Sequence, residues 1–121
     1  MVNKKELSFL NQLTSEILIL DDDLNIIWLN YAALNKGWIL NNGNKKSNLI
    51  TDQLSDETNI VLVKLFKSAI GKNISQTKRD FELIDSKMKK REIDITVRWS
   101  NTYKFLIVEI LIQKIYFEVM K

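Results

Sequence analysis

Apolar and polar residues alternate most regularly in residues 92–99 of the chain. Every second side chain there is apolar, and these side chains are Ile93, Ile95, Val97 and Trp99. Because successive side chains of a strand point to opposite faces, this period of two predicts an antiparallel strand with one solvated face. Residues 77–84 alternate in a similar way. The largely apolar residues 103–112 are predicted to form a strand at the centre of the same sheet.

Two short apolar runs, residues 17–20 and 26–29, flank the polar sequence Asp21-Asp22-Asp23-Leu24-Asn25. Asp and Asn side chains bond neighbouring backbone amides in turns, so the three elements together predict a hairpin. A calcium ion at the acidic turn is the less favoured interpretation, because calcium takes about six to eight oxygen ligands and a turn rarely supplies them.

Leu7, Leu10 and Leu13 recur at intervals of three in residues 4–14, which predicts a short helix with one apolar stripe. Such a helix is too short to be stable alone in water, so the stripe must pack on something. The alternatives are the domain's own sheet and the same helix of a second chain. Of these, dimerisation is the preferred interpretation.

Two further helices are predicted between the hairpin and the last three strands. Asn30 is expected to cap a short helix that two alanines open, because an Asn side chain accepts a bond from an orphan backbone amide. A longer helix is expected to begin after Ser55 and to end before Gly71, with Leu62 and Phe66 on its apolar face.

The chain contains no His, no Cys and no Pro. The absence of Cys excludes disulfides, thiolate nucleophiles and iron–sulfur clusters, and the absence of His excludes an imidazole base, an axial haem ligand and a histidine phosphoacceptor. We therefore predict no catalytic, cofactor-binding or metal-ligating residues and no enzymatic activity for this chain.

The net charge is +3, and residues 61–121 carry most of the positive charge, with thirteen Lys and Arg against seven acids. The densest cluster of positive charge, residues 87–91, is predicted to be a solvated turn between two strands. Aromatic residues are not interleaved with these charges, so nucleic-acid binding is an unfavoured alternative. No apolar run is long enough to cross a membrane, and a cytoplasmic location is expected.

The order of elements resembles a PAS domain, and the residues that carry the resemblance are 17–33. Their pattern is an apolar strand, an Asp pair, a second strand and then Asn-x-Ala-Ala at Asn30–Ala33. Within this family the chain is most similar to the N-terminal sensor domain of NtrB-type nitrogen-regulation histidine kinases. This rests also on Leu13-Thr14 and on the last strand, Leu106–Ile110.

The resemblance implies an α+β fold: a five-stranded antiparallel sheet, helices packed on one face and an N-terminal leader helix. The expected organisation is a leader helix over 1–14, a PAS domain over 15–113 and a C-terminal extension over 114–121 toward an output domain that this chain lacks. The implied function is a sensory and dimerisation module of a two-component system. The implied partners are a second copy, as a homodimer, and, through other domains, an NtrC-type response regulator and a PII-type protein.

Three groups of residues are candidates for function. Leu7, Leu10 and Leu13 are the expected dimer interface. A small-ligand cavity, or plain core as the favoured interpretation, is assigned to Phe66, Phe81, Ile95, Val97 and Phe105. Glu109, the one charge in the last strand, is either a buried signalling carboxylate or, preferably, an exposed residue or the partner of Arg98. A ligand-binding PAS sensor of another regulatory protein stays open as an alternative.

Overall fold

The computed structural model describes residues 4–40 and 48–112 of the chain, and the predicted extension over 114–121 lies outside them. In chain order the elements are α1 (Lys4–Leu7), the 3₁₀ helix η1 (Ser8–Gln12), β1 (Glu16–Leu20), β2 (Ile26–Leu29), α2 (Tyr31–Asn35), the 3₁₀ helix η2 (Ile50–Gln53), α3 (Asp56–Ala69), β3 (Gln76–Ile84), β4 (Lys90–Ser100) and β5 (Phe105–Ile112). The predicted α+β order of elements is confirmed.

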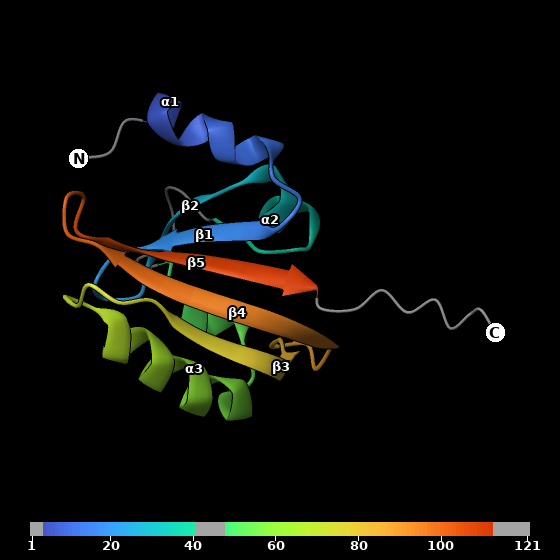
Figure 1. The fold of residues 1–121 in the computed structure, drawn as a ribbon. Helices are drawn as coiled ribbons and strands as arrows, with labels where there is room; N and C mark the ends of the chain where they lie inside the picture. Colours follow the sequence, from blue (N-terminus) through green and yellow to red (C-terminus); the bar gives the residue numbers. More distant parts are fainter. Residues whose placement is uncertain (1–3, 41–47, 113–121) are drawn as a thin grey trace.

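The strands form one antiparallel sheet in the order β2-β1-β5-β4-β3 (Figure 1). The apolar strand β5 lies at its centre, as predicted. Its neighbours are β1, which begins the sheet in sequence, and β4. Since β1 and β5 pair over five positions, the start and the end of the domain are joined directly.

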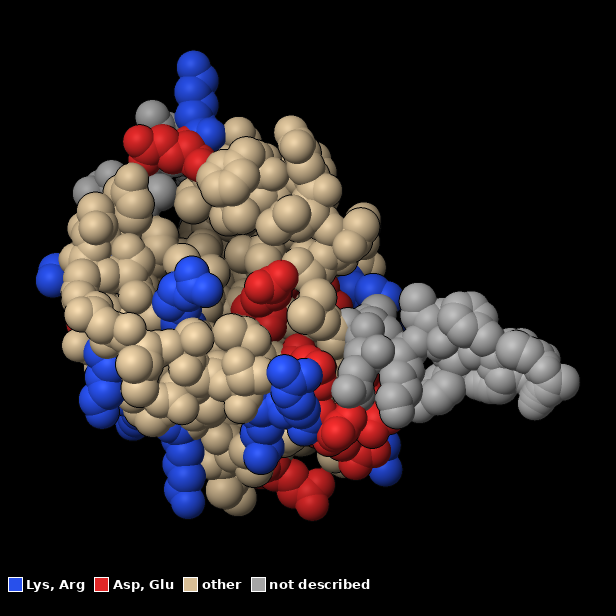
Figure 2. Space-filling model, in the orientation of Figure 1, with Lys and Arg blue, Asp and Glu red and all other residues tan. Residues whose placement is uncertain are grey.

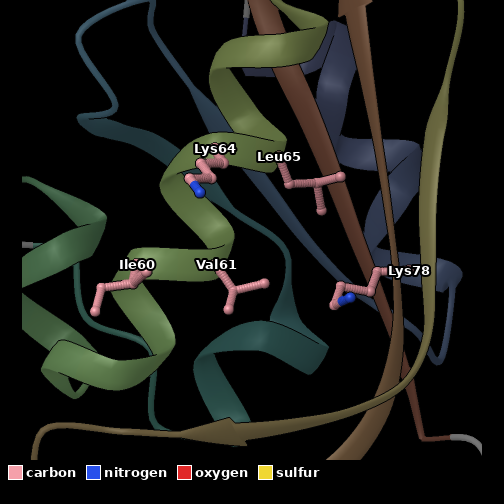
Figure 3. Close-up of a pocket in the computed structure, with 5 residues that line it drawn as sticks. All are labelled: Ile60, Val61, Lys64, Leu65 and Lys78. Atoms are coloured by element: carbon pink, nitrogen blue, oxygen red, sulfur yellow. The ribbon is translucent and has the colours of Figure 1, made fainter.

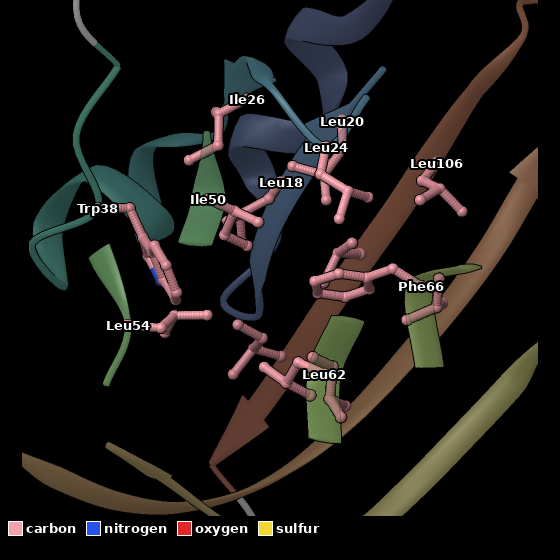
Figure 4. Packing of buried hydrophobic residues seen from close by; sticks show 14 of the residues in the cluster. Leu18, Leu20, Leu24, Ile26, Trp38, Ile50, Leu54, Leu62, Phe66 and Leu106 are labelled. Carbon is pink, nitrogen blue, oxygen red and sulfur yellow. The ribbon is translucent and has the colours of Figure 1, made fainter. Parts of the chain in front are cut away.

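The inner face of the sheet carries the main core. Leu62 and Phe66 of α3 are fully buried in this core (Figure 4), and Ile95 and Val97 of β4 are buried in the same cluster. Val108 of β5 belongs to the same cluster. The predicted alternation in β4 is therefore confirmed, because its apolar set is the set that faces the core.

The N-terminal residues 4–14, here called the leader segment, lie on the opposite side of the sheet from α3 (Figure 1). The expected single helix is a short α-helical turn followed by the 3₁₀ helix η1. A 3₁₀ helix has about 3.0 residues per turn, so side chains three positions apart eclipse one another. The Leu spacing of three suits this geometry better than it suits an α-helix.

Local hydrogen bonds agree with the predicted caps and turn. The side chain of Asn30 accepts from the amide of Ala33 and that of Ser55 accepts from the amide of Thr58. In the β1–β2 turn, Asp21 Oδ1 accepts from two backbone amides at 3.0 and 2.9 Å. These bonds confirm that the acidic cluster is turn chemistry.

In the part of the chain that the structure describes, no helix is both long and apolar enough to cross a membrane.

Candidate functional site

The leader segment packs its apolar stripe on the outer face of its own sheet. Leu7 and Leu10 are half-buried against a cluster formed by Ile17, Ile19 and Phe105. Leu13 lies beyond the end of η1 and keeps 43% of its surface exposed, and Phe9 keeps 63%. The structure thus brings two of the three predicted interface leucines together on the sheet and leaves the third outside this contact.

Charge is distributed unevenly over this side of the molecule. Figure 2 shows mainly uncharged side chains over the leader segment beyond its first residues, and charged side chains gathering lower, around β4, β3 and α3. The surface beside the leader segment is therefore the less charged part of the visible face.

Asn30 fixes the leader segment to the sheet. Its side chain is fully buried, and its Oδ1 accepts from the amides of Ile17 and Ala33 at 2.9 Å each. Its Nδ2 donates to the carbonyls of Leu10 and Ser15 at 3.0 Å each. One side chain therefore caps α2 and also ties the leader segment to β1. The sequence analysis predicted the cap but not the tie.

Glu109 lies on the outer face of β5 and is half-buried. Its Oε2 accepts a hydrogen bond of 2.7 Å from the hydroxyl of Ser15, at the junction between the leader segment and β1. Thr96, not Arg98, is its cross-strand neighbour on β4, and the ion pairs among the described residues do not include one between Arg98 and Glu109. The candidate signalling carboxylate thus joins the central strand to the residue that directly follows the leader segment.

A buried carboxylate on the inner face escaped the sequence analysis. Glu16 keeps 2% of its surface exposed, and both its oxygens bond the guanidinium of Arg91 at the start of β4. Its Oε1 also accepts from the indole N–H of Trp38 at 2.8 Å. A buried charge requires such partners, because desolvation strongly disfavours an unpaired carboxylate.

No sequence signal joins Glu16 to Arg91, because 75 positions separate them and Arg91 is one of four cations in residues 87–91. The one hint in the sequence was the spacing of Glu16, Leu18 and Leu20. Alternate residues of a strand point to the same face, so Glu16 shares the inner face of β1 with the two leucines. Ser15 and Glu16, adjacent in sequence, therefore reach opposite faces of the sheet.

Four of the five residues assigned to a cavity or core meet on the inner face. Phe66, Phe81, Ile95 and Val97 are all buried within the main cluster. Phe105 is buried as well, but in the smaller cluster on the outer face beneath the leader segment, so it does not share a cavity with the other four. Phe105 and Leu106 are adjacent in β5 and therefore point to opposite faces of the sheet, with Leu106 facing inward. Because β5 is largely apolar on both faces, its sequence does not show which residues face inward.

A shallow groove of about 330 Å³ lies between α3 and β3 (Figure 3). Ile60, Val61, Lys64 and Leu65 line it from α3, and Lys78 lines it from β3. The ammonium group of Lys78 lies 5.9 Å from the centre of the Phe81 ring. The lining contains two lysines and no acidic side chain, so the groove presents no acid–base pair on which chemistry could be built.

Acidic side chains do not gather for metal binding in the described ranges, 4–40 and 48–112: no group of three or more of them is placed to hold an ion. The polar groups that do converge, around Ser15, Glu16 and Asn30, hold segments of the chain together.

No protein-family model and no curated protein matches the chain. Among solved structures, it is similar to the PAS domain of nitrogen regulation protein NR(II) from Vibrio parahaemolyticus. The TM-score is 0.60 with 24% sequence identity, over 88% of this chain and 94% of that chain. This similarity agrees with the strand order and with the helices on the inner face. The chain has the PAS fold.

Proposed function

We propose that this chain is a sensory and dimerisation PAS module of a two-component signal-transduction protein, with a role like that of an NtrB-type nitrogen-regulation kinase. The observation that carries the proposal is the attachment of the leader segment to the sheet. Ser15 bonds Glu109 of the central strand, and Asn30 bonds the carbonyls of Leu10 and Ser15. The similarity to the NR(II) domain agrees with this role.

The proposed mechanism is mechanical. A change in the position of the leader segment alters the hydrogen bonds that Ser15 makes, and β1 passes that change to β5 because the two strands pair over five positions. The domain thereby biases an output domain of the protein that it serves. By resemblance, the downstream partner is an NtrC-type response regulator and a PII-type protein supplies the signal, both through other domains. The module itself is proposed to be cytoplasmic and non-catalytic.

The dimer is proposed to form through the exposed side of the leader segment. Phe9 and Leu13 are large apolar side chains with 63% and 43% of their surface exposed. Leu7 and Leu10, which the sequence favoured for the interface, already contact the domain's own sheet. They support the interface from beneath, because they hold the segment that carries Phe9 and Leu13.

Sedimentation equilibrium over a range of protein concentrations tests the dimer. We expect the wild-type chain to dimerise and the double variant Phe9→Ser with Leu13→Ser to be monomeric and folded, since both side chains are exposed. Ile74→Ser is the matched control, because Ile74 is also an exposed apolar residue, at 58%, but lies between α3 and β3. A monomeric wild type, or equal loss of dimer in the control, overturns this interface.

A chimera tests the relay. The chain replaces the PAS domain of an NtrB-type kinase, and autophosphorylation is measured with and without Ser15→Ala. We expect the chimera to be active and the substitution to change its activity, because Ser15 carries the link to Glu109. Unchanged activity in a folded Ser15→Ala chimera contradicts the relay while leaving the dimer intact.

A further inference from the structure

We propose that a basic cleft at one end of the sheet binds a small organic anion with two or more negative charges, such as a di- or tricarboxylate or a phosphorylated metabolite. The cleft has a volume of about 680 Å³ and lies between the residues after α2 and the turn that joins β3 to β4. Ligand sites for small molecules typically span about 300–1,000 Å³, so the cleft has the size of a metabolite site.

Five of the residues that line the cleft are cationic and one is acidic. The cations are Lys36, Lys87, Lys89, Lys90 and Arg91, and the acid is Asp85. The carboxylate of Asp85 is already engaged, since its Oδ1 accepts from the amides of Lys87 and Lys89 at 2.8 and 2.9 Å. Because Glu16 balances the charge of Arg91, four lysines face the single carboxylate of Asp85, and the cleft keeps an excess of positive charge. Ammonium groups make strong hydrogen bonds to carboxylate and phosphate.

The apolar part of the lining favours an organic anion over an inorganic one. Trp38, Ile39 and Leu83 line the cleft beside the cations. Ile39 keeps 51% of its surface exposed and supplies most of the apolar surface that a ligand can cover, because Trp38 and Leu83 are exposed by only 6% and 2%. A bare phosphate gains nothing from Ile39, whereas a carbon-bearing anion removes part of the exposed apolar surface of Ile39 from water.

Both walls of the cleft are held in place by hydrogen bonds to Gln53 at the end of η2. The Gln53 side chain accepts from the amide of Ile39 at 2.9 Å and donates to its carbonyl at 2.8 Å. The backbone carbonyl of Gln53 accepts from the amide of Ser86 in the opposite wall at 3.1 Å. Because the walls share this anchor, the cleft is formed in advance and a ligand need not order it.

Arg91 connects the cleft to the start of β1. It lines the cleft and also bonds both oxygens of the buried Glu16. A bound anion shares the guanidinium with Glu16, which directly follows Ser15 at the junction between the leader segment and β1. The site does not depend on dimerisation, and its occupancy can be measured on a monomer or a dimer.

Binding is tested by titrating the isotope-labelled full chain with citrate, glycerol 3-phosphate and inorganic phosphate while recording amide NMR spectra. We expect one of the two organic anions to shift the signals of residues 36–39 and 86–91 and the Trp38 indole N–H, with a smaller shift at Glu16. The two organic arms distinguish a carboxylate ligand from a phosphorylated one. Absence of shifts with both, or equal binding by inorganic phosphate, overturns the proposal.

The double substitution Lys87→Gln with Lys90→Gln is expected to weaken binding about tenfold, because it removes two cations from the site. The control is Lys67→Gln with Lys72→Gln, which removes the same charge from exposed positions near the C-terminal end of α3 and is expected to change binding less than about twofold. Equal weakening in both variants shows diffuse attraction and overturns the site. Binding of a single-stranded oligonucleotide in place of the small anions overturns it as well.

Discussion

The inner and outer faces of the sheet are buried by different means. The inner face packs against α3 and the residues around η2, and its large side chains are almost all removed from water. The outer face is covered by the leader segment over β1 and β5, but over β4 it carries the polar residues Thr96 and Arg98. The inner face is therefore the core of the fold, whereas the outer face has a cover attached at a few points.

The two carboxylates that link the strands follow the same division. Glu16 on the inner face is fully enclosed by Arg91 and Trp38, while Glu109 on the outer face is half-buried and has Ser15 as its partner. A buried pair resists change because either charge alone is strongly disfavoured. A half-buried link can break and re-form with water in its place, which is what a signalling contact requires.

The largest expected effect on stability comes from comparing the core on the inner face with the contact between the leader segment and the outer face. Phe66→Ala on the inner face is expected to lower the free energy of unfolding by about 4 kcal/mol, since the side chain is fully buried and leaves a cavity. Leu10→Ala in the leader segment is expected to lower it by about 1–2 kcal/mol, because Leu10 is half-buried. Urea unfolding measures both, and equal losses would show that the leader segment belongs to the core.

Removal of Arg91 tests the inner carboxylate. Arg91→Ala leaves Glu16 buried without its cation and is expected to destabilise the chain by about 3 kcal/mol. Arg98→Ala is the matched control, because Arg98 is an exposed arginine of the same strand, and its effect is expected to stay within about 0.5 kcal/mol. Similar effects of the two substitutions would remove the distinction between the faces.

Asn30→Ala is expected to cost about 2 kcal/mol, because it removes a helix cap and leaves buried backbone groups without a partner. Amide hydrogen exchange of the Asn30→Ala variant compares the leader segment with the core of the sheet. The amides of the leader segment should lose protection most, whereas those of β4 should keep theirs relative to global unfolding. Uniform loss of protection would contradict a separable leader segment.

The smallest expected effect on stability concerns the hydrogen bond between Ser15 and Glu109 on the outer face. Ser15→Ala is expected to destabilise the chain by about 1 kcal/mol through loss of the hydroxyl that bonds Glu109. Ser8→Ala removes a hydroxyl that bonds only the exposed carbonyl of Lys5, and thermal unfolding should barely change. A Ser15 variant as stable as the Ser8 variant would mean that water replaces the link without loss.

Sequence by itself determined the features that depend on neighbouring residues. The period of two in β4 gave its buried face, Asn30 and Ser55 gave the starts of α2 and α3, and Asp21 gave the first turn. These features follow from strand geometry and from hydrogen bonds that span two to four residues. The same local order of elements was enough to suggest the PAS fold.

The tertiary structure decided every feature in which distant segments meet. It joined Glu16 to Arg91 and Trp38, placed Phe105 beneath the leader segment, and brought Lys36 to the lysines of the turn between β3 and β4. A continuous apolar run such as β5 does not tell which of its faces meets the core, and a charged residue does not tell which charge it will meet. Those choices depend on sheet order and packing, because only the folded chain brings the partners within bonding distance.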